Sequence, residues 1–193
     1  GATGASVVGT KHTHMSHYRT EVLNAFPEAK WIEIVRDPRG WYCSAKVSHP
    51  MRGALHAAWL WNKGYRTFAR EHVSGAARTL LITFEDLIMR RSEALNELAR
   101  FIGLEFRASE EWLRNLGLVG NDGGVAWRSN SSYEKNSGQA VGVGGMMPAG
   151  AKGYDLLDPV PVFRWQKRLS PIEKFLVAAA TYPTRRRLGV HLG

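Results

Sequence analysis

The stretch Trp31-Ile32-Glu33-Ile34-Val35-Arg36-Asp37-Pro38-Arg39 decides how this chain folds. Its first five residues are rich in β-branched and aromatic side chains, which predicts a buried strand over 31–35. Asp37 can cap a helix whose first position is Pro38, because the proline ring presets the helical φ angle there. A strand that turns directly into a helix delivers Arg36 to the carboxyl end of the strand, where open α/β sheets bind their ligands.

Further strands and helices are predicted around this corner. A second β-rich run over 79–84 predicts a strand parallel to the first, because helical patterns separate the two. Alternating strands and helices favour an α/β layer with right-handed crossovers. A longer helix is predicted after Pro50, with Leu55, Trp59, Asn62 and Arg66 at successive turns. The other predicted helices are 18–26, 38–44, 92–101 (stopped by Gly103), 110–116, 163–169 and 171–180.

The composition limits the class of protein. A chain of 193 residues with 44% hydrophobic residues can bury one core, which excludes a wholly disordered chain and favours a single domain over 1–193. No apolar run approaches the roughly 18 residues that cross a bilayer. The one cysteine, Cys43, excludes an internal disulfide framework and a Cys-rich zinc site. Residues 1–9 lack the features of a signal peptide, so we expect a cytoplasmic protein.

The formal net charge of +9 implies an anionic partner. Nucleic-acid binders often carry blocks of like charge, whereas the cations here are dispersed and the densest cluster is Arg185–Arg187. Dispersed cations suit a pocket for a small polyanion at least as well as a duplex groove. The charge alone therefore leaves both kinds of partner open.

Two side chains at the corner suit a phosphate group. Arg36 supplies a forked, permanently charged donor, and Ser44 adds a hydroxyl eight residues later, about two turns into the predicted helix. The N-terminus of that helix favours an anion as well. The alternative from the pattern alone is that Arg36 and Asp37 only cap the corner, while Ser44 is a small packing residue.

The motifs resemble those of the PAPS-dependent sulfotransferases, especially the bacterial-type branch; PAPS, 3′-phosphoadenosine 5′-phosphosulfate, is the sulfuryl donor. In that family a strand ends in an Arg-Asp-Pro-Arg-like turn, and this Arg and a Ser eight residues later hold the 3′-phosphate. The matching positions here are Arg36 and Ser44. The resemblance implies a P-loop-NTPase-like parallel sheet flanked by helices. The further matching stretches, in the expected order, are 84–87, 101–104, 130–133 and 164–170.

The resemblance also implies catalytic roles for Lys11 and His14. Lys11 fits the place of a Lys-Thr-Pro-like motif of bacterial-type relatives, and 13–15 is similar to the second half of a Lys-Thr-His-Leu motif whose His is a base. Sulfuryl transfer requires that a proton is removed from the acceptor, a role that suits a His. It also requires that charge on the leaving phosphate is neutralised, a role that suits a Lys. Val7 and Val8 predict a strand that delivers Lys11. Solvent-exposed loop histidines remain the alternative for His14.

The resemblance implies PAPS as co-substrate and no metal. His12, His14 and His17 form a poor metal-ligand set, since no acidic or Cys partner accompanies them. Glu85 and Asp86 are expected to orient the end of the sheet or to cap the next helix.

A long segment rich in Gly, Asn and Ser over 117–153 predicts a loop that closes over nucleotide and acceptor. Within it, Lys152-Gly153 is similar to an Arg-Lys-Gly turn that touches the 3′-phosphate in cytosolic relatives. The family's Gly/Ser/Thr-rich loop for the 5′-phosphosulfate has no counterpart, since 4–11 has its Thr and Lys in reversed order for a Walker loop. We therefore expect an N-terminally incomplete domain.

The function expected from this resemblance is sulfuryl transfer from PAPS to a hydroxyl or amine. The acceptor would be a small molecule, a glycan or a lipid, with no nucleic acid as partner and no membrane segment in the chain. Two alternatives stay open: an inactive remnant that binds PAPS or another nucleotide, and a basic nucleic-acid-binding protein. A phosphotransferase would need an intact Walker loop and Mg²⁺ ligands, which are not visible in the sequence.

Overall fold

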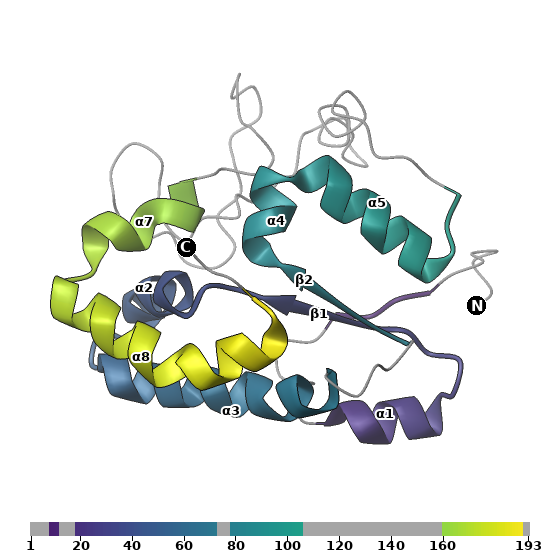
Figure 1. The fold of residues 1–193 in the computed structure, drawn as a ribbon, viewed down its shortest axis with the longest axis horizontal. Coiled ribbons are helices and arrows are strands. Elements are labelled where there is room, and N and C mark those ends of the chain that lie inside the picture. Colours follow the sequence, from purple (N-terminus) through teal and green to yellow (C-terminus); the bar gives the residue numbers. More distant parts are fainter. Residues whose placement is uncertain (1–7, 12–17, 73–77, 106–159, 191–193) are drawn as a thin grey trace, which may run out of the picture.

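The computed structural model describes residues 8–11, 18–72, 78–105 and 160–190 (Figure 1). The predicted helix 110–116, the predicted loop 117–153 and the residues His14, Lys152 and Gly153 lie outside these ranges. None of the described helices combines the length and the apolar character that a bilayer-spanning segment requires.

Both predicted strands form, and they pair in parallel. β1 covers Trp31–Val35 and β2 covers Thr79–Thr83, in register along their whole length. Among the described residues, these two strands make up the sheet. Because parallel strands end at the same edge of a sheet, Arg36 and Phe84 follow β1 and β2 at neighbouring positions.

The helices begin and end at residues that the local sequence specifies. Asp37 Oδ1 accepts a hydrogen bond of 2.7 Å from the backbone nitrogen of Arg39 and caps the helix that starts at Pro38, as predicted. Gly103 ends another helix at a φ of 84°, where a residue with a Cβ is strained. The described helices are α1 Arg19–Ala25, α2 Pro38–Ser48, α3 Ala54–His72, α4 Phe84–Met89, α5 Arg91–Ile102, α7 Val160–Arg168 and α8 Pro171–Leu188.

Two helices differ from the prediction. The side chain of Thr83 accepts a hydrogen bond from the backbone nitrogen of Asp86 and caps α4, so β2 ends one residue early and a short helix follows it. α8 continues beyond Ala180 to Leu188 and includes Pro183. Tertiary packing of its buried residues offsets the hydrogen bond that a proline removes from a helix.

The predicted strand over Val7 and Val8 is wrong at Val8, which is 84% exposed and lies in no strand. β-branched residues favour strands because they pack on a half-buried pleated surface, and a side chain this exposed gains no such packing. Val7 lies outside the described residues.

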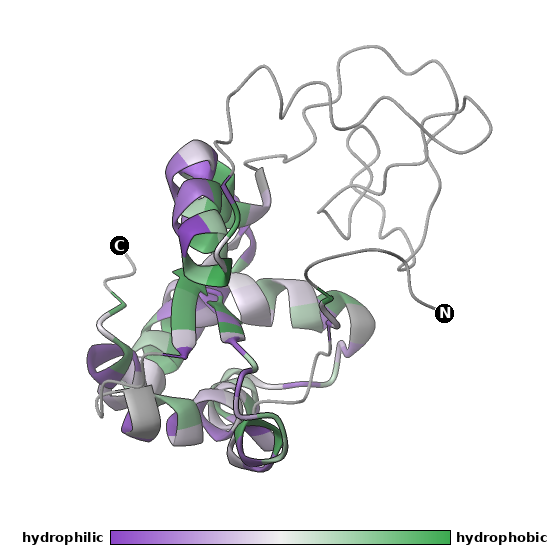
Figure 2. Cartoon of the chain, turned by 90° about the vertical axis from the view of Figure 1, so that its right-hand side faces the viewer, coloured by the Kyte–Doolittle hydropathy of each residue, from purple (hydrophilic) through white to green (hydrophobic). Residues whose placement is uncertain are grey.

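Helices cover both faces of the sheet. α3 and α8 lie side by side on one face and α5 lies on the other, while α2 and α7 lie beyond the carboxyl ends of the strands (Figure 1). The strands carry mostly hydrophobic residues (Figure 2). One core cluster lies between β1, α3 and the end of α8 and includes Val35, Trp61, Phe68 and Leu188. Burial of this cluster holds the α3–α8 layer on the sheet.

α3 buries a different side from the one that its large apolar residues suggest. Of the four positions at successive turns, Asn62 is buried and donates a 2.9 Å hydrogen bond to the carbonyl of Ala180, whereas Leu55 and Trp59 are 59% and 56% exposed. The buried side instead carries small residues together with Trp61 and Phe68. Small residues allow α3 and α8 to approach closely.

Glu173 joins the start of α8 to α2. Its Oε1 accepts hydrogen bonds from Tyr42 Oη at 2.8 Å and Lys46 Nζ at 2.7 Å, and its Oε2 accepts one from the backbone nitrogen of Ser170 at 2.9 Å. Burial raises the pKa of Glu173, but hydrogen bonds from Lys46, Ser170 and Tyr42 outweigh this effect and lower the pKa to about 2. The carboxylate therefore stabilises the packing of α8 on α2.

Replacing the Glu173 carboxylate should change how the unfolding free energy of the protein depends on pH. The folded pKa of Glu173 lies below the ordinary 4.5, so its contribution is present above pH 4.5 and is lost as the pH falls toward 2. We expect Glu173→Gln to unfold at lower urea than the wild type at pH 7, with a difference that shrinks below pH 4.5. Glu28→Gln, at an exposed position, is the control and should change stability by less than about 0.5 kcal/mol at pH 7. If Glu173→Gln were less stable than the wild type by the same amount at every pH, the prediction would be contradicted.

Candidate functional site

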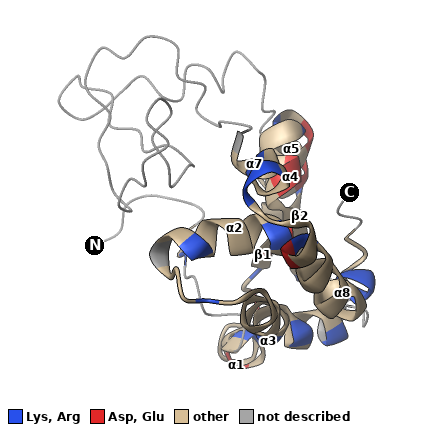
Figure 3. Cartoon of the chain, turned by 90° about the vertical axis from the view of Figure 1, so that its left-hand side faces the viewer, with Lys and Arg blue, Asp and Glu red and all other residues tan. Residues whose placement is uncertain are grey.

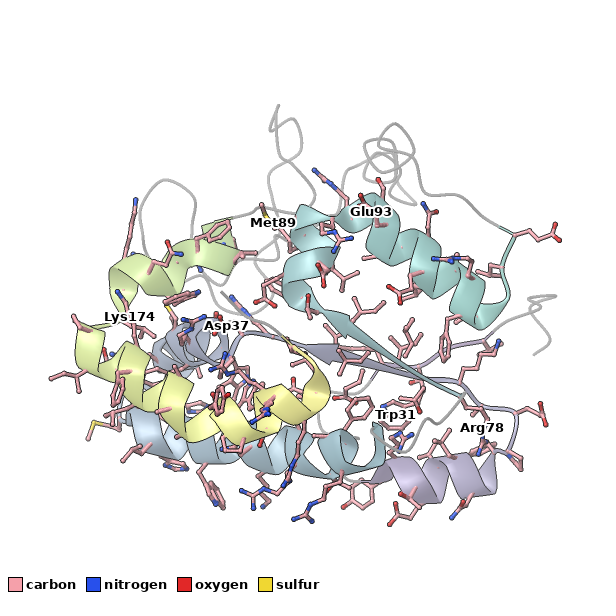
Figure 4. All side chains as sticks on the ribbon, viewed as in Figure 1. Trp31, Asp37, Arg78, Met89, Glu93 and Lys174 are labelled. Carbon is pink, nitrogen blue, oxygen red and sulfur yellow. The ribbon has the colours of Figure 1, made fainter. Side chains whose placement is uncertain are left out.

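The corner between β1 and α2 is built around a neutralised aspartate. Asp37 is buried, and its carboxylate caps α2 while it pairs with the guanidinium of Arg39 at 2.6 Å. The Arg39 guanidinium carbon lies 3.8 Å from the ring centroid of Trp165, which fixes its other side. Asp37 therefore lies where the chain passes from the sheet into α2 (Figure 4), with its charge already compensated.

Three helices hold the guanidinium of Arg36. Its Nη1 donates to Ser44 Oγ on α2 at 3.0 Å, and its Nη2 donates to the carbonyl oxygen of Pro161 on α7 at 2.8 Å. Its central carbon lies 4.5 Å from the ring centroid of Phe84, at the start of α4. The structure thus brings the predicted pair Arg36 and Ser44 into direct contact; their role in phosphate binding stays a prediction.

Gly40 gives the guanidinium its place beside α2. A Cβ at Gly40 would lie 3.3 Å from Arg36 Nε and 3.6 Å from Trp165 Cδ1, so the first turn of α2 lies against both side chains. The sequence patterns did not point to Gly40. The sequence feature that could have pointed to it is a glycine in the first turn of a predicted helix, because glycine has a low helix propensity.

The side of the corner that faces α2 and α7 is positively charged. Burial raises the pKa of the Cys43 thiol, and the nearby Arg164, Arg36, Arg168 and Lys46 lower it. Arg164, Arg36 and Arg168 therefore lie near the middle of α2, where Lys46 pairs with Glu173, and Figure 3 shows Lys and Arg on both α2 and α7. Burial lowers the pKa of Arg36 itself; Glu85 opposes this lowering and Arg164 adds to it. The electrostatic field here favours an anion.

Glu85 ties α4 to the same corner. Its Oε1 accepts a hydrogen bond of 3.1 Å from the backbone nitrogen of Asp37, which orients the end of the sheet as the sequence predicted. Its Oε2 is buried and has no hydrogen-bond partner among the described residues. Burial raises the pKa of Glu85 and the hydrogen bond from Asp37 lowers it, with a net rise. A proton on this carboxyl group is therefore held more tightly in the folded protein.

A cavity of about 610 Å³ opens between α4, α5, α7 and the end of α8. Its lining includes Asp37, Met89 and Glu93, which Figure 4 labels, and also Glu85 and Trp165. Arg36 and Ser44 do not line it. Because carboxylates dominate its charged lining, an anion at the corner is directed to the α2 side and away from this cavity.

Of the other predicted site residues, the structure describes only Lys11. Lys11 is exposed, and within the described residues no hydrogen bond joins it to Ser44. His14, Lys152 and Gly153 lie outside the described residues. Among the residues that are described, no group of His, Cys, Asp and Glu could hold a metal ion.

Comparisons with known proteins show what the chain is similar to. A sequence profile of the Sulfotransferase family matches residues 2–108, more than half of the chain. No curated protein sequence matches it.

Two solved structures share the fold. The sulfotransferase domain from the Synechococcus PCC 7002 olefin synthase has a TM-score of 0.56 and 20% identity, covering 92% of this chain and 55% of that one. The sulfotransferase domain from the curacin biosynthetic pathway has a TM-score of 0.57 and 18% identity, covering 95% and 62%. The chain thus spans less than two thirds of either structure. These likenesses confirm the predicted P-loop-NTPase-like α/β fold.

The close approach of Gly40 to Arg36 predicts different effects on stability for two glycine substitutions. Gly64→Ala, in α3 with open space around it, should stabilise the fold by about 0.5–1 kcal/mol because alanine favours a helix. Gly40→Ala should not stabilise the fold in this way, because the added Cβ would displace the Arg36 guanidinium, which two hydrogen bonds hold in place. Urea unfolding measures both. Equal stabilisation by the two changes would show that Arg36 moves freely.

The raised pKa of Glu85 predicts a slope in stability above pH 4.5. Between the unfolded value of 4.5 and the higher folded value, the folded state binds more protons, so the unfolding free energy falls as the pH rises. Glu85→Gln keeps an acceptor for the Asp37 amide and removes the titration, so its stability should fall less over this range. The matched control is Glu97→Gln on the exposed side of α5. Parallel curves for wild type and Glu85→Gln would contradict the assignment.

Proposed function

Since the chain belongs to the sulfotransferase family, we propose that it moves a sulfuryl group from PAPS to a hydroxyl or amine of a small-molecule, glycan or lipid acceptor. The observation that supports the proposal most directly is the 3.0 Å contact between Arg36 Nη1 and Ser44 Oγ in the middle of α2. This places a guanidinium and a hydroxyl at one position, which suits the 3′-phosphate of the donor.

The donors of this pair are not exhausted by the contacts within the protein. Ser44 accepts a hydrogen bond from Arg36, so its own hydroxyl hydrogen can be donated to a phosphate oxygen. Arg36 Nε is buried and has no acceptor among the described residues. A guanidinium has five N–H donors, and the contacts with Ser44 and Pro161 leave others for an anion. The corner therefore supplies directed donors as well as charge.

The surrounding charge suits a phosphate dianion. Arg164 and Arg168 on α7 lie near enough to Cys43 to oppose the rise that burial causes in the pKa of its thiol. Each cation adds to the field of Arg36, and partial burial strengthens these interactions relative to water. A ligand with phosphates on both sides of its ribose fits this excess of positive charge.

The transfer step would be an in-line displacement at sulfur. The acceptor oxygen or nitrogen attacks the sulfur, the bond from sulfur to the bridging phosphate oxygen breaks, and 3′,5′-bisphosphoadenosine leaves. In this proposal His14 takes the proton of the acceptor and Lys11 neutralises the bridging oxygen. Lys152 and Gly153 add contacts to the 3′-phosphate. Positioning and charge stabilisation supply most of the rate, as they do in phosphoryl transfer.

Calorimetric titration with two nucleotides tests the assignment of the corner. Wild-type protein should bind 3′,5′-bisphosphoadenosine more tightly than adenosine 5′-phosphate, which lacks the 3′-phosphate. We expect Arg36→Ala to weaken bisphosphoadenosine binding by roughly 10- to 100-fold, because hydrogen bonds to charged groups contribute about 1.5–3 kcal/mol. Ser44→Ala should weaken it less. Neither change should affect adenosine 5′-phosphate to the same extent.

Arg66→Ala on the exposed side of α3 is the matched control and should leave both affinities unchanged. Equal binding of the bisphosphate by wild type and Arg36→Ala would remove the site assignment. A loss of both nucleotides in equal measure would place Arg36 elsewhere on the ligand. Transfer of labelled sulfate from PAPS to a panel of hydroxyl and amine acceptors then tests the activity itself.

A further inference from the structure

α8 exposes a row of apolar side chains on the side that faces away from the core. Ile172, Phe175 and Tyr182 are 71%, 70% and 54% exposed, and their spacing places them on one side of the helix. The opposite side of α8 is buried in the core. A surface helix usually has a polar outer side, so apolar residues on both sides need a reason beyond folding.

α3 extends this apolar surface. Leu55 and Trp59 are more than half exposed, and Met51 just before the helix is 98% exposed. α3 and α8 run side by side in the same direction on one face of the sheet (Figure 1). The hydrogen bond from Asn62 to the carbonyl of Ala180 joins the middle of α3 to the middle of α8. The exposed apolar residues of both helices therefore start at the same end of the layer.

Cations follow the apolar residues along both helices. Lys63 Nζ lies 5.4 Å from the ring centroid of Trp59, and Arg66 and Arg70 are exposed further along α3. The end of α8 has a hollow of about 450 Å³. The hollow is lined by Tyr182, Pro183, Arg186 and Arg187.

The acidic residues do not balance this charge. The one acidic residue of α8, Glu173, is bound by Lys46, Tyr42 and Ser170 at the start of the helix. α3 likewise has one acidic residue, Glu71, against its three Lys and Arg residues. The outer surface of the α3–α8 layer thus combines exposed aromatic and aliphatic side chains with a strong excess of positive charge.

We propose that the outer surface of the α3–α8 layer docks on an anionic lipid bilayer. Trp, Tyr, Phe and Leu beside Lys and Arg are typical of helices that lie in the membrane interface, where apolar side chains enter the acyl boundary and cations meet the headgroups. The hollow at Tyr182, Arg186 and Arg187 would receive an anionic headgroup. The proposal does not depend on sulfuryl transfer, because it involves neither Arg36 nor Ser44.

Other occupants fit this surface less well. A second copy of the chain would bring the arginines of one α8 close to a surface of the same charge, which is repulsive. A single acidic partner helix could cover the row on α8, but it would leave Leu55 and Trp59 on the neighbouring helix uncovered. A bilayer is broad enough to cover both helices at once.

Vesicle co-sedimentation of the purified full chain tests the proposal. We expect binding to phosphatidylcholine vesicles that contain 30% phosphatidylserine, little binding to vesicles of phosphatidylcholine alone, and weaker binding as salt increases. The double substitution Arg186→Glu with Arg187→Glu should weaken binding by roughly 30-fold or more, since each cation near an anionic surface contributes about a factor of five. Trp59→Ser with Phe175→Ser should weaken it by roughly 10-fold or more.

Matched controls change the same chemistry elsewhere on the surface. Lys167→Glu with Arg100→Glu alters the net charge equally on α7 and α5, and Tyr18→Ser with Phe26→Ser removes two exposed aromatic residues near α1. Both controls should weaken vesicle binding far less than the α3–α8 variants. Circular dichroism and thermal unfolding of each variant separate loss of binding from loss of fold.

Three results would overturn the proposal. The first is no binding to phosphatidylserine vesicles at low salt. The second is equal weakening by the control variants, which would mean adsorption by net charge rather than docking of this surface. The third is binding to a soluble amphipathic peptide helix with Glu flanks while vesicles are not bound, which would assign the surface to a protein partner.

Discussion

The partly buried guanidinium of Arg36 is the constraint on which the corner of this molecule depends. It follows β1, bonds to Ser44 on α2 and to the carbonyl of Pro161 on α7, and lies on the ring of Phe84 at the start of α4. A buried charge without acceptors costs several kcal/mol, so these contacts fix where the helices meet the sheet. A donor held in this way loses little freedom when it binds an anion, which favours affinity.

The same corner separates charges of opposite sign. Arg164 and Arg168 of α7 lie near Cys43, whereas Asp37 and Glu85 line the cavity beside α4 and α5. Arg39 pairs with Asp37 at 2.6 Å, whereas Glu85 and Asp37 both oppose the lowering that burial causes in the pKa of Arg36 and so partly offset its positive field. The α2 side of the sheet edge therefore favours an anion more than the cavity side does, and this asymmetry arises from which helix each side chain belongs to.

Local patterns account for much of the fold, and their failures have physical causes. The strands and the caps at Asp37 and Gly103 follow from interactions within a few residues, and they form as predicted. The helix predicted after Pro50 forms as α3, but its pattern did not specify the buried side, where small residues pack while Trp59 lies outward. The length of α8 was underestimated because packing in the core overrides the proline at 183.

The sequence alone determined the pair of parallel strands, the helix that opens at Pro38, and the spacing that brings Ser44 to Arg36, because a helix of known pitch fixes side chains two turns apart. Only the tertiary structure decided that Pro161, 125 residues beyond Arg36, accepts its second hydrogen bond, and that Glu85 reaches the amide of Asp37 across 48 residues. Such contacts depend on how whole elements pack after distant segments come together, and no local pattern of residue types encodes that arrangement.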